Sequence, residues 1–125
     1  TYLAELSGGR FQLHFVISGE KLNIDIIDDG QTITIDALSA GELARVNIST
    51  LLAIRKLMAA ISNTKINLLF LDEAYSVLDS NGKDTLTEVL LKEDLNTLLV
   101  AHDYSHPLIS IINVIKENNM SRLEI

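Results

Sequence analysis

The order of apolar and polar positions changes near residue 36. Before that point, apolar side chains recur at every second position, and turns with Gly19 and Gly30 divide the alternation. Such alternation around glycine turns is typical of β-hairpins. The predicted strands are residues 10–17, 21–27 and 32–35. We therefore expect an antiparallel meander with one solvent-exposed face, and we place His14 on that polar face without a chemical role.

From residue 37 onward, apolar positions recur with the spacing of a helix. The helix is predicted to begin at Leu38-Ser39-Ala40-Gly41-Glu42, to continue to about Ser62 and to end at Asn63-Thr64. Because apolar positions cover most of its circumference, we expect it to be largely buried. The polar positions that predict a narrower exposed stripe are Arg45, Asn47, Arg55 and Lys56.

Two short apolar runs, residues 66–71 and 96–101, flank a predicted helix over residues 80–92 with Leu86, Val89 and Leu90 on its inner face. Short, mainly apolar runs without alternation predict strands buried on both faces, and a strand–helix–strand order predicts that they are parallel. Less regular elements are expected at both ends of the chain. They are a helix end at residues 1–6, a short helical turn after Pro107, and strands at 113–116 and 122–125.

Composition agrees with an α/β domain. The 125 residues are a natural size for one domain, and 47% hydrophobic with only 5% aromatic residues indicates an aliphatic core. Cysteine is absent, which excludes thiolate metal sites, and no segment approaches the length of a membrane helix, so a cytoplasmic protein is expected. A net charge of -7 argues against general nucleic-acid binding. Because the chain starts with Thr1 rather than Met, we expect a fragment.

Two carboxylates follow the first apolar run directly. Asp72 and Glu73 should therefore lie at the carboxyl edge of the sheet, where open α/β sheets bind ligands. One interpretation is that the acids only end the strand and are solvated. The other is a Walker B element, in which the first acid holds Mg²⁺ and the second orients or deprotonates an attacking water.

The start of the long helix also allows two interpretations. Ser39 and Glu42 match a helix capping box, which is a structural motif. The Ser39 hydroxyl, the free amides of the helix N-terminus and a glycine at position 41, which lets a ligand approach closely, also form a site for an anion such as phosphate.

Two further motifs follow the predicted strands. Ser76-Val77-Leu78-Asp79 is either a loop whose Asp79 caps the next helix or part of a functional site. His102, at the end of the second apolar run, is either a surface histidine or a donor to a phosphate oxygen. His106 is interpreted as a loop residue.

Taken in order, LSAGE, LLFLDEA, SVLD and VAHD resemble the C-terminal half of an ABC-type ATPase, where they are the signature motif, Walker B, the D-loop and the H-loop. The preceding helix end and meander narrow the resemblance to the C-terminal lobe of SMC-like DNA-repair ATPases. The nearest likeness is to the ATPase large subunit of phage recombination endonucleases, related to the SbcC type that repairs double-strand breaks. In this resemblance residues 1–125 form one C-lobe, with a coiled-coil end at 1–9, a β-meander at 10–36 and the α/β region at 37–125.

The resemblance implies a nucleotide site shared between two heads. Asp72 would help to hold Mg²⁺, Glu73 would activate water, and His102 would contact the γ-phosphate of ATP in the same head. The residues that it assigns to the ATP site of a second, identical head are Ser39, Gly41 and Asp79. It also implies a nuclease subunit and DNA ends as partners of the full complex, in a bacterial or phage-infected cell and without a membrane.

Two departures from the family pattern matter. Ala40 replaces the usual first glycine of the signature motif, which leaves Ser39 and Gly41 in place. No G-x-x-x-x-G-K-[ST] motif occurs, so the phosphate cradle must come from a separate N-lobe carrying Walker A, and this chain alone is expected to be inactive. The alternatives are another ABC ATPase, such as a transporter subunit or another SMC-like protein, and a non-catalytic dimerisation module.

Overall fold

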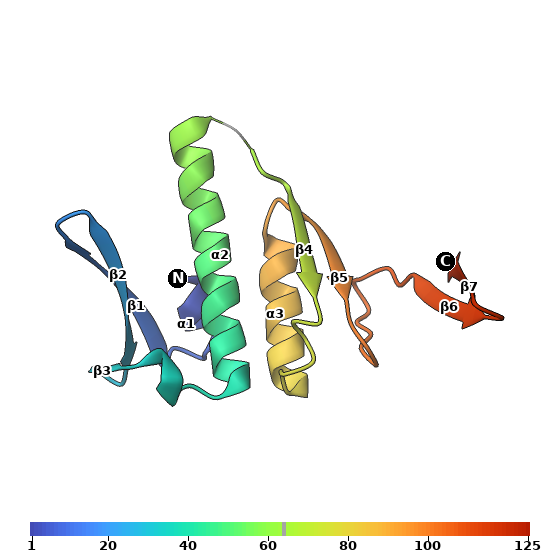
Figure 1. Ribbon diagram of the computed structural model, residues 1–125, viewed down its shortest axis with the longest axis horizontal. Helices are drawn as coiled ribbons and strands as arrows, with labels where there is room; N and C mark the ends of the chain where they lie inside the picture. The colour runs from blue at the N-terminus through green and yellow to red at the C-terminus, as the bar shows by residue number, and fades with distance from the viewer. Residues whose placement is uncertain (64) are drawn as a thin grey trace.

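The computed structural model describes residues 1–63 and 65–125, and it has the predicted order of elements (Figure 1). The helices are α1 (Tyr2–Leu6), α2 (Ala40–Ser62) and α3 (Ser80–Lys92), with a 3-10 turn η1 (Ile35–Ala37) before α2. The strands are β1 (Phe11–Ser18), β2 (Lys21–Asp28), β3 (Gln31–Ile33), β4 (Leu68–Asp72), β5 (Asn96–Val100), β6 (Asn113–Glu117) and β7 (Met120–Glu124). The predicted meander, long helix and parallel strand–helix–strand unit are confirmed.

The meander is an antiparallel sheet in the order β1-β2-β3. Ser18 pairs with Lys21, so a two-residue turn joins β1 to β2. In the next turn Asp29 and Gly30 both have positive φ, 46° and 81°, which is the backbone that a tight Asp-Gly hairpin turn requires. His14 is exposed, as predicted.

Helix α2 lies between the meander and the β4–α3–β5 unit (Figure 1). One core cluster joins α1 and the meander to Val46 of α2, and a second joins β4 and α3 to Ile48 and Leu52. The helix ends at its C-cap residue Asn63, whose φ of 52° is left-handed. Thr64, the other residue predicted at this end, lies outside the described residues.

Two predictions of burial are wrong. In β4, Leu71 packs into the core, but Leu68 and Phe70 are exposed, because the helices cover only one face of the β4–β5 sheet. Helix α2 is buried at four positions, and apolar residues of its C-terminal half, including Leu57 and Ile61, are exposed. These apolar side chains are exposed to solvent in the described part of the chain.

The polar stripe predicted on α2 is confirmed only in part. Asn47 and Lys56 are exposed, whereas Arg45 and Arg55 are partly buried. The guanidinium of Arg55 donates to the carbonyls of Ile66 and Asp94 and forms an ion pair with Glu93. Arg55 thus ties α2 to the segments that precede β4 and β5.

The two predicted C-terminal strands are present as β6 and β7, and β7 begins two residues before its predicted start. Strands β6 and β7 pair with each other as an antiparallel hairpin and add nothing to the β4–β5 sheet. After Pro107 the chain makes a turn, in which the amide of Ile109 donates to His106, and no helix forms in this described segment. His106 is a loop residue, as predicted. Within the described part of the chain, no helix is both long and apolar enough to cross a membrane.

Candidate functional site

The candidate acids lie where β4 leaves the sheet. Asp72 is the last residue of β4 and pairs with Val100, and the amide of Glu73 then donates to the carbonyl of Val100 at 3.0 Å. Glu73 has φ of 51°, in the left-handed region that few residues without special constraint adopt. The strand pairing therefore continues to Glu73, and the chain turns sharply there at the carboxyl edge of the sheet.

Glu73 and His102 lie side by side at this edge. His102 Nε2 is 3.7 Å from Glu73 Oε1, and the two side chains are 80% and 64% exposed. The pair is an ion pair only when the imidazole is protonated. Two residues that are 29 positions apart in the sequence therefore present a proton acceptor and a potential hydrogen-bond donor to the same region of solvent.

Asp72 adds a carboxylate that has no hydrogen bond or ion pair with any described residue. Its position in the strand alternation places it with Phe70 and Leu68, on the sheet face that the helices leave open. No group of three acidic, histidine or cysteine side chains that could hold a metal occurs among the described residues. Mg²⁺ commonly binds through one or two carboxylates together with water and substrate phosphates, so a single free carboxylate here fits it.

The start of α2 is a complete capping box. Ser39 Oγ accepts the amide of Glu42 at 3.3 Å, and Glu42 accepts the amide of Ser39 at 2.8 Å. Within the described chain, the amides of Ala40 and Gly41 have no acceptor. The exposed serine and two free amides are therefore available to an incoming anion.

A charge network fixes this helix start against the meander. Arg10 donates to Glu42 at 2.7 Å and makes a two-pronged contact with Asp28 at 2.7 and 2.9 Å. The hydrogen bonds from Ser39, together with the charge of Arg10, lower the pKa of the Glu42 carboxyl. Hydrogen bonds from Arg10 likewise lower the pKa of Asp28.

The predicted D-loop packs directly on the start of α2. A Cβ at position 41 would lie 2.9 Å from the carbonyl oxygen of Val77, a distance that real Cβ atoms essentially never show. Asp79 caps α3 by accepting the amide of Gly82 at 2.9 Å, and it pairs with Arg45 of α2 at 3.1 Å. Gly41 is thus required for close packing against the loop.

The structure gathers the six candidate residues into two groups. The first group is Asp72, Glu73 and His102, and the second is Ser39, Gly41 and Asp79. Ser39 and Asp79 both cap helices, so the capping role that the sequence allowed for each of them is present in the structure. Figure 1 shows that α2 and α3 begin at the end of the molecule toward which β4 and β5 run.

The sequence pattern does not indicate the contacts of Arg10 and Gly82 at the site. Arg10 begins a predicted strand, and its partners are 18 and 32 positions away. Gly82 lies in a predicted helix, and a Cβ there would lie 2.6 Å from Arg45 and 2.7 Å from Asp79. No local pattern signals either contact, because each depends on how α2 packs against another element.

Comparison with known proteins supports the resemblance. No family model matches the chain. The probable exonuclease subunit 2 of Escherichia phage T5 is 44% identical over 117 residues, which are 93% of this chain. The match spans only 19% of that protein.

Two solved structures share the fold. The SMC head bound to the C-winged helix domain of ScpA superposes with a TM-score of 0.78 at 19% identity and covers 98% of this chain and 39% of that chain. A second structure, described under ATP-driven dimerization and DNA-stimulated activation of SMC ATPases, superposes with a TM-score of 0.73 at 17% identity. It covers 98% of this chain and 77% of that chain. The predicted resemblance is confirmed to this extent: the chain shares the fold of SMC heads, and its sequence is similar to that of a phage exonuclease subunit.

Proposed function

We propose that this chain is the C-lobe of an ATP-hydrolysing head in a DNA repair or recombination ATPase. The observation that carries the proposal is the 3.7 Å approach of His102 to Glu73 at the carboxyl edge of the β4–β5 sheet. A carboxylate and an imidazole at such an edge suit hydrolysis of the phosphoanhydride bond of ATP, the carboxylate for the attacking water and the imidazole for the γ-phosphate.

Three residues act within their own head in this proposal. Asp72 helps to hold Mg²⁺, which supplies neutralisation of charge on the phosphate oxygens. Glu73 orients the attacking water and accepts its proton, and His102 donates a hydrogen bond to the γ-phosphate. The left-handed backbone at Glu73 turns the chain away from the sheet at the position of these three groups.

The other three residues serve a second copy of the head. Ser39 and the free amides at the start of α2 bind the triphosphate held by the neighbouring head, and Asp79 lies at the contact between heads. Ser39→Arg should fill this anion site and prevent ATP-dependent dimerisation. The close approach of Gly41 to Val77 supports the assignment, because it makes the start of α2 and the loop one packed surface.

A missing N-lobe explains the open sheet face. The exposed apolar residues there are Leu68, Phe70, Leu98 and Val100. Contiguous apolar surface of this kind marks a site of protein contact. We propose that an N-lobe carrying Walker A covers it and brings the phosphate cradle beside Asp72.

A nuclease subunit and DNA complete the proposal. The phage T5 relative is described as a probable exonuclease subunit, which supports a role at DNA ends through a nuclease partner. The acidic character of the chain supports DNA contact through the full complex rather than through this lobe.

The test combines this chain with an N-lobe that carries Walker A and measures Mg-ATP hydrolysis. We expect turnover only in the mixture, and we expect Glu73→Gln to lower kcat by about 100-fold or more while the ATP-joined dimer accumulates. Glu88→Gln, at an exposed site on α3, is the matched control and should leave kcat unchanged. Absence of turnover in the mixture would favour the non-catalytic module, and full turnover by Glu73→Gln would exclude Glu73 as the base.

A further inference from the structure

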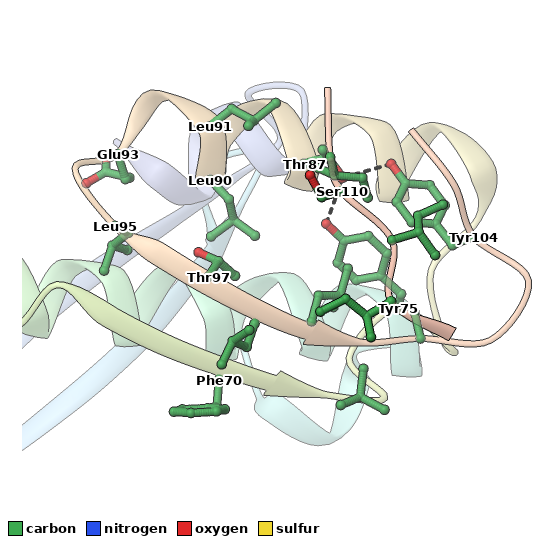
Figure 2. A pocket seen from close by; sticks show the side chains of 17 residues that line it. Phe70, Tyr75, Thr87, Leu90, Leu91, Glu93, Leu95, Thr97, Tyr104 and Ser110 are labelled. Atoms are coloured by element: carbon green, nitrogen blue, oxygen red, sulfur yellow. Dashed lines mark hydrogen bonds between the residues drawn. The ribbon is translucent and has the colours of Figure 1, made fainter. Parts of the chain in front are cut away.

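Behind the candidate site, three hydroxyl groups form a hydrogen-bonded network. Thr87 of α3 bonds to the hydroxyl of Tyr75 at 2.8 Å and to the hydroxyl of Tyr104 at 2.7 Å (Figure 2). The two tyrosine rings also meet edge to face, with centroids 4.9 Å apart. One threonine of α3 therefore joins two tyrosines that come from different loops.

The network is largely shielded from solvent. Tyr75 and Thr87 are 1% and 3% exposed, and Tyr104 lies beside them at the end of a cavity of about 560 Å³ between α3, β5 and residues 109–112. Burial raises the pKa of Tyr75 to about 12, so its hydroxyl keeps its proton at neutral pH and can donate. Buried hydroxyls without partners are costly, so the three groups hold one another in place.

The hydrogens in the network are limited. Thr87 Oγ1 also approaches the carbonyl of Lys83 at 3.0 Å, and the hydroxyl of Tyr104 approaches Asp84 at 3.2 Å. The three hydroxyl groups have three hydrogens for these four contacts, because a carboxylate or carbonyl can only accept. At most three of the contacts are therefore satisfied at one time, and three of the four involve Thr87. Loss of the Thr87 hydroxyl thus weakens the attachment of both tyrosines.

Each tyrosine lies two residues after a candidate catalytic residue. Tyr75 follows Glu73 in a tight turn, in which the hydroxyl and amide of Ser76 both bond to the carbonyl of Glu73. Tyr104 follows His102 in the loop after β5. The two loops therefore have a common anchor on α3, in addition to the strand pairing between β4 and β5.

We propose that Thr87, through Tyr75 and Tyr104, is a positioning residue that fixes the spacing between Glu73 and His102 for ATP hydrolysis. The inference rests on the proposed function. Reaction rates depend steeply on the placement of catalytic groups, and a shift of about 1 Å can cost about 100-fold. The network holds the loops that carry Glu73 and His102, so its effect should fall on the chemical step.

The test uses the full protein, with both lobes, and three substitutions in α3. Thr87→Val removes the hydroxyl and keeps the shape, and Thr87→Ser keeps the hydroxyl. Thr85→Val is the matched control, because it removes a hydroxyl from the same helix whose one hydrogen bond to a described residue is to the carbonyl of Asn81. Hydrolysis is measured per ATP-occupied head, together with KM and the fraction of heads that bind ATP.

We expect Thr87→Val to lower kcat per occupied head by about tenfold with an unchanged KM and unchanged ATP occupancy. Thr87→Ser should restore most of the rate, and Thr85→Val should match the wild type. A purely structural role would lower ATP occupancy in Thr87→Val without changing turnover per occupied head, and that result would overturn the inference.

The same measurements separate this inference from the proposed function. If Glu73→Gln is inactive and Thr87→Val turns over like the wild type, only the positioning role is wrong. If the wild-type protein does not hydrolyse ATP, the proposed function fails, and the positioning role fails with it.

Discussion

At the scale of single residues, Gly41 shows how the site constrains the sequence. Its backbone φ is not in the left-handed region, so the need for glycine comes from the neighbouring loop, whose Val77 carbonyl occupies the space of a side chain. The sequence motif predicted that Gly41 matters for close approach of a ligand. The structure adds an approach by the chain itself, which no local pattern could reveal.

Gly41→Ala should therefore destabilise the protein. The new Cβ would have to displace backbone at 2.9 Å, and overpacking of this kind typically costs about 1–3 kcal/mol of unfolding free energy. Denaturant unfolding measures the loss. Asn47→Ala, at an exposed position of the same helix, should change stability by less than about 0.5 kcal/mol. Equal stability of the two variants would contradict the close packing described for Gly41.

The sequence predicted the positions of Asp72, Glu73 and His102 at one sheet edge, but it did not predict the contacts that hold their loops. Asp72, Glu73 and His102 follow apolar runs, and parallel strands bring such positions to one edge, so their proximity could be expected from the pattern. The anchoring of their loops by Thr87 could not, because a threonine in an amphipathic helix gives no sign of its distant partners.

At the scale of elements, the start of α2 depends on charge. The pKa of Glu42 is lowered by hydrogen bonds from Ser39 and by Arg10. A carboxyl whose pKa is lower in the folded state than in the unfolded state stabilises the protein above the unfolded value, which is about 4.5 for Glu42. That contribution is lost as pH falls through the folded-state pKa.

Glu42→Gln should accordingly be less stable than the wild type at pH 7, and the difference should shrink as pH falls below about 4.5. The unfolding free energies of both proteins, measured in denaturant between pH 3 and 7, provide the comparison. Glu88→Gln, which changes an exposed carboxyl on α3, is the matched control. A constant difference between wild type and Glu42→Gln over this range would mean that the charge of Glu42 has no part in stability.

Arg55 has a comparable role at the other half of α2. Its planar guanidinium reaches two carbonyls and one carboxylate at once, which a lysine ammonium at one point cannot reproduce. Arg55→Lys should cost about 1–3 kcal/mol of unfolding free energy, whereas Lys65→Ala should cost little, since its contact with Asp94 is exposed. Thermal unfolding of both variants checks the difference. A loss for Lys65→Ala as large as that for Arg55→Lys would contradict it.

Element boundaries were predictable where caps and turns are local. The hairpin turns, the capping box of α2 and the Asp79 cap of α3 all depend on residues within three positions of one another. Burial was not predictable, because an apolar run indicates a surface that packs against something and does not show whether the covering residues belong to this chain. The sequence therefore predicted more buried residues in β4 and α2 than the structure has.

At the scale of the whole molecule, the proposed function requires nucleotide sites that two heads build together. In this proposal Glu73 serves the nucleotide of its own head, and Ser39 serves the nucleotide of the neighbour. Closed dimers with twofold symmetry use the same surface of each copy, so each dimer would contain two equivalent sites. This division of labour makes a prediction that a site within one head does not share.

The most direct measurement mixes two inactive proteins, one with Ser39→Arg and one with Glu73→Gln, and follows Mg-ATP hydrolysis. In a mixed dimer, one site combines an intact Glu73 with the intact Ser39 of the other head, so activity should return. Each mixed dimer has one intact site, and Ser39→Arg disfavours dimerisation, so we expect a rate clearly above that of either protein alone but below the limit of about a quarter of the wild-type rate that random pairing would give. If the mixture remains as inactive as either protein alone, Ser39 and Glu73 do not serve the sites of different heads.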